Sequence, residues 1–483
     1  MILAGVFAFV WSVVRARVQS MTLDEADTYF WFVANSEVFY PFPNNHVLNT
    51  ILMWVATHAF GLSSLTARMP ALLGAGLYIV ACYFLCRSIT DRFSLQFPLF
   101  ICLVFNPFIL DFMVAARGYS LANAFLLVAI AIPVSDRLEI RTACVLASLA
   151  LGLSFASNFS FAFVDVAAFL ALVAWAQRRE SSWRVFWLCV LPGFFVALLI
   201  CGYTLMHMRR GDLFYGAHSL GEMTRSLVDA SLYQLSPRFG GSLYKVMRFL
   251  KPLMLPALAI LCLLQIVVTR RVGRLAAGLM SIITLAVVLH WLAFRFDHLA
   301  LPLSRTGIFL LPLSTLFAGA IAAAPAPSVV ARWLQRGMTA VFICLACYFA
   351  LCLRLSYFKE YEYDRDVKDV YAVLARLNHR YGVTDVAASG VYASSLNFYR
   401  AASGKESFPD FKAVAGEFPS GRAMYVMDGP FDRKFIEREG LVVIYQGKST
   451  AVVVAVRPEL VEDPWRYDPM ICWQHSPMRQ LGA

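Results

Sequence analysis

The sequence predicts a polytopic α-helical membrane protein of about eleven transmembrane helices, followed by a C-terminal α/β domain. Of its 483 residues, 59% are hydrophobic and only 15% are charged, whereas soluble domains carry about 25% charged residues. Its mean hydropathy is +0.64. Apolar runs recur as far as Leu353, and an ordinary polar composition follows. The expected domains are therefore a transmembrane domain at 1–353 and an α/β domain at 354–483.

Membrane-spanning helices need about 20 apolar residues each. Arginines cluster in alternate connections, for example at 178–184, and such clusters mark the cytoplasmic side. The C-terminal domain is then expected to be extracytoplasmic. The first expected span is too short for a bilayer, and Arg15 and Arg17 follow it on the outer side against this rule. We expect the true start to lie upstream, and a tilted first helix supported by its neighbours is the alternative. The expected spans are 2–14, 66–86, 95–110, 119–134, 143–157, 159–176, 185–206, 252–268, 276–293, 307–323 and 337–353.

The first outer loop, residues 15–65, contains the acidic stretch "TLDEADTYFWF". Thr22 and Glu25 have the spacing of a capping box, in which each side chain bonds the other's backbone amide, and the helix dipole favours Asp24. Three carboxylates at an apolar interface, however, raise each other's pKa and lose hydration. Such placement usually serves a function. Asp24 and Glu25 are therefore candidates for catalysis or metal binding, and capping alone is the alternative.

The segment at 46–61 predicts a helix that lies at the outer membrane interface. Its helical part spans only about 21 Å at about 1.5 Å per residue, too short to cross a bilayer, and Asn49 and Thr57 give it a polar edge. Asn45 and His46 precede it and could contact a polar ligand. Asn-Asn before a helix is also an ordinary cap.

Two further polar groups lie on the outer side. "NPFILDFMVAARGYSL" interrupts an apolar run with Asp111, Arg117 and Tyr119, which predicts either a ligand site or a structural Asp–Arg pair. "LPLSRTGIFLLP" brings Arg305 to the outside before a span. Its guanidinium can hold a phosphate or extend to the lipid headgroups.

The polar C-terminal part predicts a small α/β domain. Val367, Val370, Tyr371, Leu374 and Leu377 share one face of a helix over 364–382, with Gly382 as its cap. Strands are expected at 423–428, 441–447 and 450–457. We expect this domain to cover the site or to help select the acceptor.

Composition also argues against other classes of protein. The net charge is +11, but the arginines are scattered between apolar runs, so nucleic-acid binding has little support. Ten of the eleven cysteines lie in apolar runs and only Cys472 lies in the polar part, which therefore has no internal disulfide. No internal repeat is visible, which argues against a transporter or lipid flippase. A non-catalytic membrane scaffold is the other alternative.

Four segments in order, "LDEADTY", "NNHVLNTIL" with "GLSSLTARMPALLGA", "NPFILDFMVAARGYSL" and "LPLSRTGIFLLP", resemble the bacterial GT-C glycosyltransferases. That broad group includes protein O-mannosyltransferases and lipid A aminoarabinose transferases, and the resemblance covers essentially the whole chain. It implies a GT-C-like fold, Asp24 as catalytic base with Glu25 beside it, and a polyprenyl-phosphate sugar donor bound from the outer leaflet.

The resemblance implies a hexosyl- or pentosyltransferase of the bacterial inner (plasma) membrane, surrounded by membrane lipids. Its acceptor would be a hydroxyl of a glycolipid, a polysaccharide or a protein. Arg117 and Arg305 would hold the phosphate, and Asn45, His46, Asp111 and Tyr119 would bind substrate. A divalent cation, Mg²⁺ or Mn²⁺, could lie between Asp24, Glu25 and His46, although the sequence does not demand one.

Overall fold

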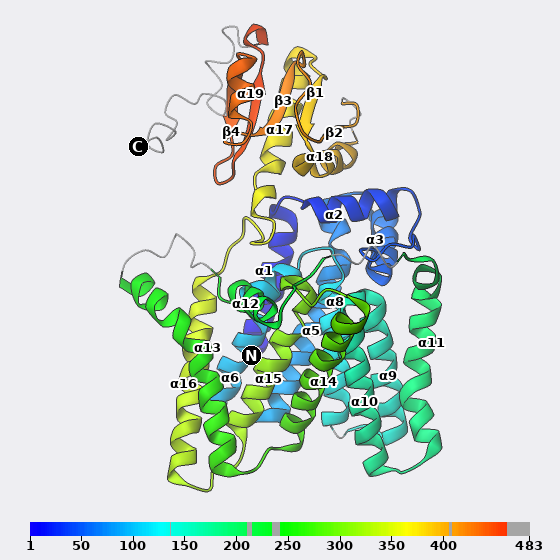
Figure 1. The fold of residues 1–483 in the computed structure, drawn as a ribbon, viewed down its shortest axis with the longest axis vertical. Helices are drawn as coiled ribbons and strands as arrows, with labels where there is room; N and C mark the ends of the chain where they lie inside the picture. The colour runs from blue at the N-terminus through cyan, green and yellow to red at the C-terminus, as the bar shows by residue number, and fades with distance from the viewer. Residues whose placement is uncertain (136, 210–214, 234–241, 405–407, 461–483) are drawn as a thin grey trace. The chain divides into compact units, whose positions relative to one another are not determined.

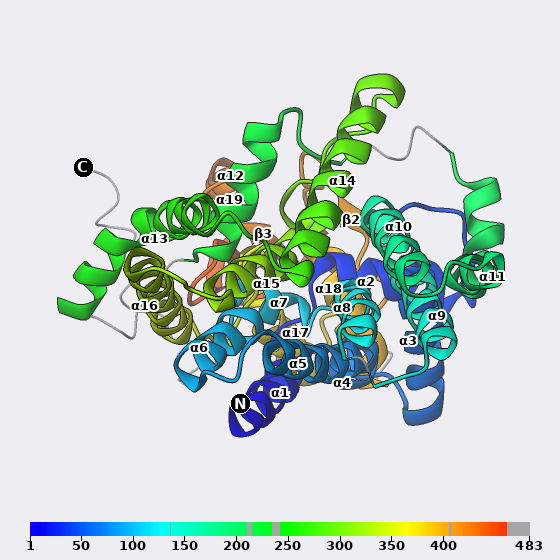
Figure 2. The same cartoon turned by 90° about the horizontal axis from the view of Figure 1, so that it is seen from below.

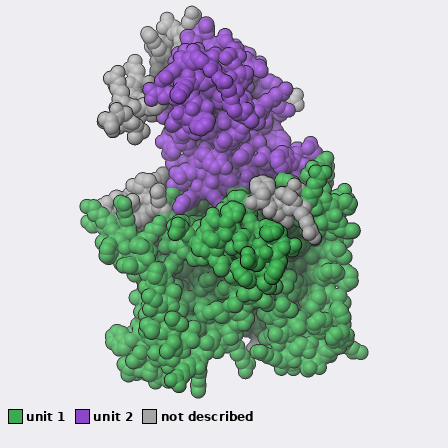
Figure 3. Space-filling view, viewed as in Figure 1, with its two compact units in different colours: residues 1–16, 36–59, 65–355 green, residues 17–35, 60–64, 356–483 purple. Residues whose placement is uncertain are grey.

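The computed structural model describes residues 1–135, 137–209, 215–233, 242–404 and 408–460, and the chain divides into two compact units (Figure 3). Unit 1 comprises residues 1–16, 36–59 and 65–355, and unit 2 comprises 17–35, 60–64 and the chain from Ser356. The boundary at Ser356 lies close to the composition change. Residues 17–35, assigned above to the first outer loop, belong to the same unit as the C-terminal domain. Cys472 lies outside the described residues.

Unit 1 is a bundle of helices that run alongside one another in Figure 1 and are seen end-on in Figure 2. A helix lies at each of the eleven expected positions. These helices are α1 (Ile2–Val18), α5 (Met69–Ile89), α6 (Phe93–Val104), α8 (Tyr119–Ser135), α9 (Ile140–Ser157), α10 (Ala162–Arg179), α11 (Trp183–His207), α13 (Ser242–Thr269), α14 (Arg274–Asp297), α15 (Leu310–Ala323) and α16 (Val329–Leu351). Shorter helices connect them: α3 (Val47–Phe60), α4 (Ser64–Ala67), α7 (Pro107–Phe112) and α12 (Leu220–Ser231).

Within the described ranges, seven helices are long and apolar enough to cross a membrane, or up to eight if the bent pair 2–18 and 23–34 counts as one. The protein is therefore a multi-pass membrane protein, but four of the eleven expected spans do not meet that length criterion singly. The expected span 95–110 shows why one of them is too short. Asn106 caps a new helix by accepting from the amides of Phe108 and Ile109, and Pro107 follows as its first residue. This start splits the run into α6 and α7.

Glycines allow two close approaches in unit 1. A Cβ on Gly152 of α9 would lie 2.2 Å from the carbonyl oxygen of Gly193, so α9 and α11 meet backbone to backbone. Gly118 has φ +73°, and a Cβ there would lie 2.1 Å from the Ser157 carbonyl oxygen. Only glycine fits this turn, which fixes the backbone on either side of it.

Unit 2 contains a five-stranded sheet of order β2-β1-β3-β5-β4, in which β1 pairs in parallel with β2 and β3, and β5 pairs antiparallel with β3 and β4. The three expected strands are confirmed. The elements are α17 (Val367–Tyr381), β1 (Val386–Ser389), α18 (Gly390–Ser403), β2 (Ala413–Val414), β3 (Met424–Asp428), α19 (Arg433–Arg438), β4 (Val442–Gln446) and β5 (Val452–Val456).

The helix expected over 364–382 is also confirmed as α17. Its predicted apolar face is buried except at Tyr371, which is half-buried, and Gly382 caps the helix with φ +64°. The predicted fold class, a polytopic helical membrane protein with a C-terminal α/β domain, is therefore correct.

Candidate functional site

The acidic stretch forms α2 (Leu23–Thr28) and continues into a π-helical turn at Tyr29–Ala34 in unit 2. The capping box is present: the Thr22 amide donates to Glu25 Oε2 at 3.0 Å, and the Glu25 amide donates to Thr22 Oγ1 at 3.3 Å. Glu25 is fully buried. Helix capping therefore accounts for the carboxylate at position 25, and a catalytic or metal-binding role of Glu25 stays a prediction.

Asp24 lies next to Glu25 but is only half-buried. Its Oδ2 accepts a hydrogen bond from the hydroxyl of Tyr361 at 2.7 Å, and Tyr361 itself is buried. The structure thus pairs the predicted base with a residue that the sequence analysis did not single out. Unlike Glu25, Asp24 takes no part in the capping box.

Asp364 is a second buried acid beside α2. Its Oδ2 accepts from the amide of Leu23 at 2.8 Å, and its side chain is 1% exposed. Burial raises the pKa of Asp364 well above its usual range, and the negative charges of Glu25, Asp24 and Asp27 raise it further. The neutral, protonated form of this carboxyl is therefore favoured.

In unit 1, His46 gathers with three other predicted residues. Burial, followed by the charges of Arg117 and Arg305, holds the pKa of His46 well below its usual range. Its ring lies 5.6 Å from that of Tyr119. Neither ring nitrogen has a hydrogen-bond partner among the described residues. A neutral imidazole offers one donor and one acceptor, so the group can bind a hydroxyl or a phosphate oxygen.

Arg117 is buried and donates to Oδ1 of Asn44, and its own carbonyl accepts from Asn158 Nδ2 at 3.3 Å. These contacts hold the guanidinium near the start of α3. The guanidinium of Arg305 lies over the ring of Tyr215, 4.8 Å from its centroid. Both arginines are therefore held in place by neighbouring side chains rather than extended into solvent.

The side chain of Asn45 holds the loop before α3 together by hydrogen bonds. It is fully buried, and its Nδ2 donates to the carbonyls of Val38 and Tyr40, each at 3.0 Å. Its Oδ1 accepts from the Thr50 hydroxyl at 2.9 Å. These bonds correspond to the capping alternative, and its role in substrate binding stays a prediction.

Asp111 lies in a buried charged cluster whose members the sequence did not connect. Arg15 bonds its Oδ1 at 2.5 Å, and the hydroxyl of Tyr233 donates to its Oδ2. The guanidinium of Arg354 lies 4.6 Å from the centroid of the Tyr233 ring. The structural pair considered above was with Arg117, and the pair observed is with Arg15. The same contact explains how a basic residue is accommodated near the end of α1, because Arg15 is buried and paired with an acid. Binding of substrate by Asp111 stays a prediction.

Asp111→Asn is expected to lower the free energy of unfolding by about 3–5 kcal/mol, because it leaves the buried guanidinium of Arg15 without its anion. The thermal midpoint in detergent measures this loss. Glu180→Gln is the matched control, because it removes the partner of the exposed Arg141, and surface pairs contribute little. Equal midpoints for the two variants would contradict the structural role.

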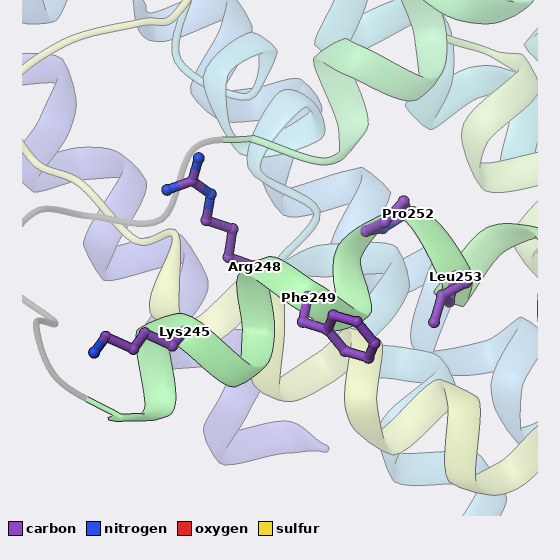
Figure 4. Close-up of a pocket in the computed structure, with 5 residues that line it drawn as sticks. All are labelled: Lys245, Arg248, Phe249, Pro252 and Leu253. Atoms are coloured by element: carbon purple, nitrogen blue, oxygen red, sulfur yellow. The ribbon is translucent and has the colours of Figure 1, made fainter.

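A hollow also opens on α13, with a volume of about 490 Å³ (Figure 4). Lys245 and Arg248 contribute positive charge, and Phe249, Pro252 and Leu253 line the rest. Cations above apolar side chains suit an amphiphile with an acidic head. Both cations are exposed, and such residues also extend to lipid headgroups. The hollow alone assigns no ligand.

Within the ranges that the structure describes, no three His, Cys, Asp or Glu side chains lie close enough to hold a metal ion. The carboxylate of Glu25 is already bonded to the Thr22 amide. Binding of a metal ion by Asp24, Glu25 and His46 stays a prediction.

No protein-family model matches the chain, and no curated protein matches it. Among solved structures it is similar to ArnT from Cupriavidus metallidurans in the apo state, with a TM-score of 0.51 and 11% identity. It is also similar to the same protein bound to undecaprenyl phosphate, with a TM-score of 0.52 and 11% identity. Each comparison covers 95% of this chain and 98% of the other. The likeness confirms the predicted GT-C-like fold over the length of both chains.

Proposed function

We propose that this protein is a membrane glycosyltransferase that moves a sugar from a polyprenyl-phosphate-linked donor to an acceptor hydroxyl, with Asp24 as the base. The observation that carries the proposal is the fold, which matches ArnT over nearly the whole of both chains and which in ArnT holds undecaprenyl phosphate. The half-buried Asp24, oriented by Tyr361, and the basic group around His46 support it.

In this reaction the carboxylate of Asp24 takes the proton of the acceptor hydroxyl as its oxygen attacks the anomeric carbon. The new bond joins acceptor oxygen to carbon. The bond from that carbon to the phosphate oxygen breaks, and the polyprenyl phosphate leaves with the electron pair. Positive charge stabilises that leaving group. We assign the binding of the donor phosphate, which is held in the bound donor as well as while it leaves, to the guanidinium groups of Arg117 and Arg305, with His46 and Tyr119 beside them.

We further propose that the catalytic face is extracytoplasmic and that the membrane is the bacterial inner membrane. The arginine-rich connections at 87–92, 178–184 and 270–274 support this orientation. The acceptor would then be a glycolipid, a polysaccharide or a protein on that face, and the transferred sugar a hexose or a pentose.

The test is transfer of radiolabelled sugar from a panel of polyprenyl-phosphate sugars in membranes that contain the protein. We expect labelling that depends on one donor class and that fractionates with an acceptor. Absence of labelling from every donor, with folded protein in the membrane, would contradict the proposal and favour the transporter or the scaffold.

The prediction of a bound divalent cation is tested by measuring the transfer rate with and without a chelator. Because no suitable ligand group is present among the described residues, we expect EDTA to leave the transfer rate within about twofold of its original value. Loss of activity with EDTA, restored by Mg²⁺ or Mn²⁺ but not by Ca²⁺, would contradict this expectation and indicate that Asp24 binds a metal ion.

A further inference from the structure

The segment that carries the proposed base is held by residues of the C-terminal part of unit 2. The Met21 amide donates to the Tyr399 hydroxyl at 2.8 Å, and the Leu23 amide donates to Asp364 Oδ2 at 2.8 Å. The Ser20 hydroxyl donates to the Arg365 carbonyl at 2.7 Å. Residues 20–23 are therefore fixed by partners that lie more than 340 positions later in the chain.

A further long-range contact reaches the base itself. Tyr361 donates to Asp24 Oδ2 at 2.7 Å, the length of a charge-assisted O–H···O⁻ bond. The ring of Tyr361 is 3% exposed and packs edge-on against Phe358, with ring centroids 6.5 Å apart. The packed ring thus fixes the position of the Tyr361 hydroxyl, and its hydrogen bond restricts the rotation of the Asp24 carboxylate.

A purely structural reason for this bond is weak. The N-terminus of α2 is already capped by Thr22 and Glu25, so the helix does not need Asp24 as a cap. The hydroxyl also contacts a half-buried side chain rather than a backbone group. A bond that orients an accessible carboxylate in this way is typical of a group that supports a reacting residue.

We propose that Tyr361 is a positioning residue for the transfer reaction, and that its hydroxyl holds the Asp24 carboxylate in the orientation that accepts the proton of the acceptor hydroxyl. This inference rests on the proposed function. It makes the segment that follows the last transmembrane helix part of the catalytic centre, in addition to any role of the C-terminal domain as a cover or in selecting the acceptor.

The test is Tyr361→Phe, which removes one oxygen and keeps the ring. A hydrogen bond to a charged group contributes about 1.5–3 kcal/mol, so kcat is expected to fall by about 10- to 100-fold. KM for the donor is expected to stay unchanged, because the bond acts on the base. Tyr445→Phe is the matched control in the same unit, since the buried Tyr445 hydroxyl has no hydrogen-bond partner within the described part of the chain.

The outcomes separate this inference from the proposed function. A Tyr361→Phe variant with the kcat of Tyr445→Phe, while Asp24→Asn is inactive, would overturn the inference alone. A change in the thermal midpoint or in KM without a change in kcat would also overturn it, because it would indicate a structural role. Full activity of Asp24→Asn would contradict the proposed function itself.

Discussion

Asp24→Asn is expected to reduce kcat by about 10²- to 10⁴-fold, which is the usual contribution of a general base. The amide has the shape of the carboxylate but does not take up a proton at neutral pH. Its oxygen can still accept from the Tyr361 hydroxyl, which bonds Asp24 Oδ2 at 2.7 Å in the wild type. The fold should therefore be retained, and the loss should be in the rate of transfer at saturating donor.

Asp27→Asn is the matched control, because Asp27 lies on the same short helix and is also half-buried. It undergoes the same chemical change, and we expect a rate within about threefold of the wild type. If the two variants lost activity equally, the effect would reflect the charge of the helix as a whole. If Asp24→Asn remained active, the base would have to be another residue.

Arg117→Lys is expected to raise KM for the donor by about 10- to 100-fold while kcat changes little. Lysine keeps the positive charge but lacks the planar fork that binds two phosphate oxygens, and one charged hydrogen bond contributes about 1.5–3 kcal/mol. Arg117 is buried and bonded to Asn44, so substitution by alanine would leave a cavity and confuse the result. Steady-state kinetics over a range of donor concentrations measure the effect.

Arg141→Lys provides the comparison, because Arg141 is exposed and pairs with Glu180 on the surface. Its KM should equal that of the wild type. A fall in kcat for Arg117→Lys at unchanged KM would contradict the assignment of this residue to donor phosphate binding. It would instead place the guanidinium in the stabilisation of the transition state alone.

Features with a local cause were predictable from the sequence. Thr22 and Glu25 are three positions apart, and the capping box follows from that spacing. The apolar face of α17 and its Gly382 cap were predicted in the same way. Helices formed at all the expected apolar runs, because helices satisfy the backbone within a membrane. Their ends were less predictable, since Asn106 and Pro107 start a new helix inside one apolar run.

Contacts between distant parts of the chain were not predictable. Arg15 and Asp111 are 96 positions apart, and Tyr361 and Asp24 are 337 apart, so no local spacing indicates either pair. Strand β1 was missed because "VAAS" has four residues and no alternation of apolar and polar side chains. Its place between β2 and β3 depends on pairing rather than on propensity.

The most direct test of the central claim measures both products of the reaction with purified protein. The wild type is incubated with a polyprenyl-phosphate sugar labelled in the sugar, together with membrane acceptors, and the label transferred is compared with the polyprenyl phosphate released. We predict equal amounts of the two in the wild type and neither above background in Asp24→Asn. Equal release by wild type and Asp24→Asn, or no release by either, would contradict the claim that this chain transfers a sugar with Asp24 as the base.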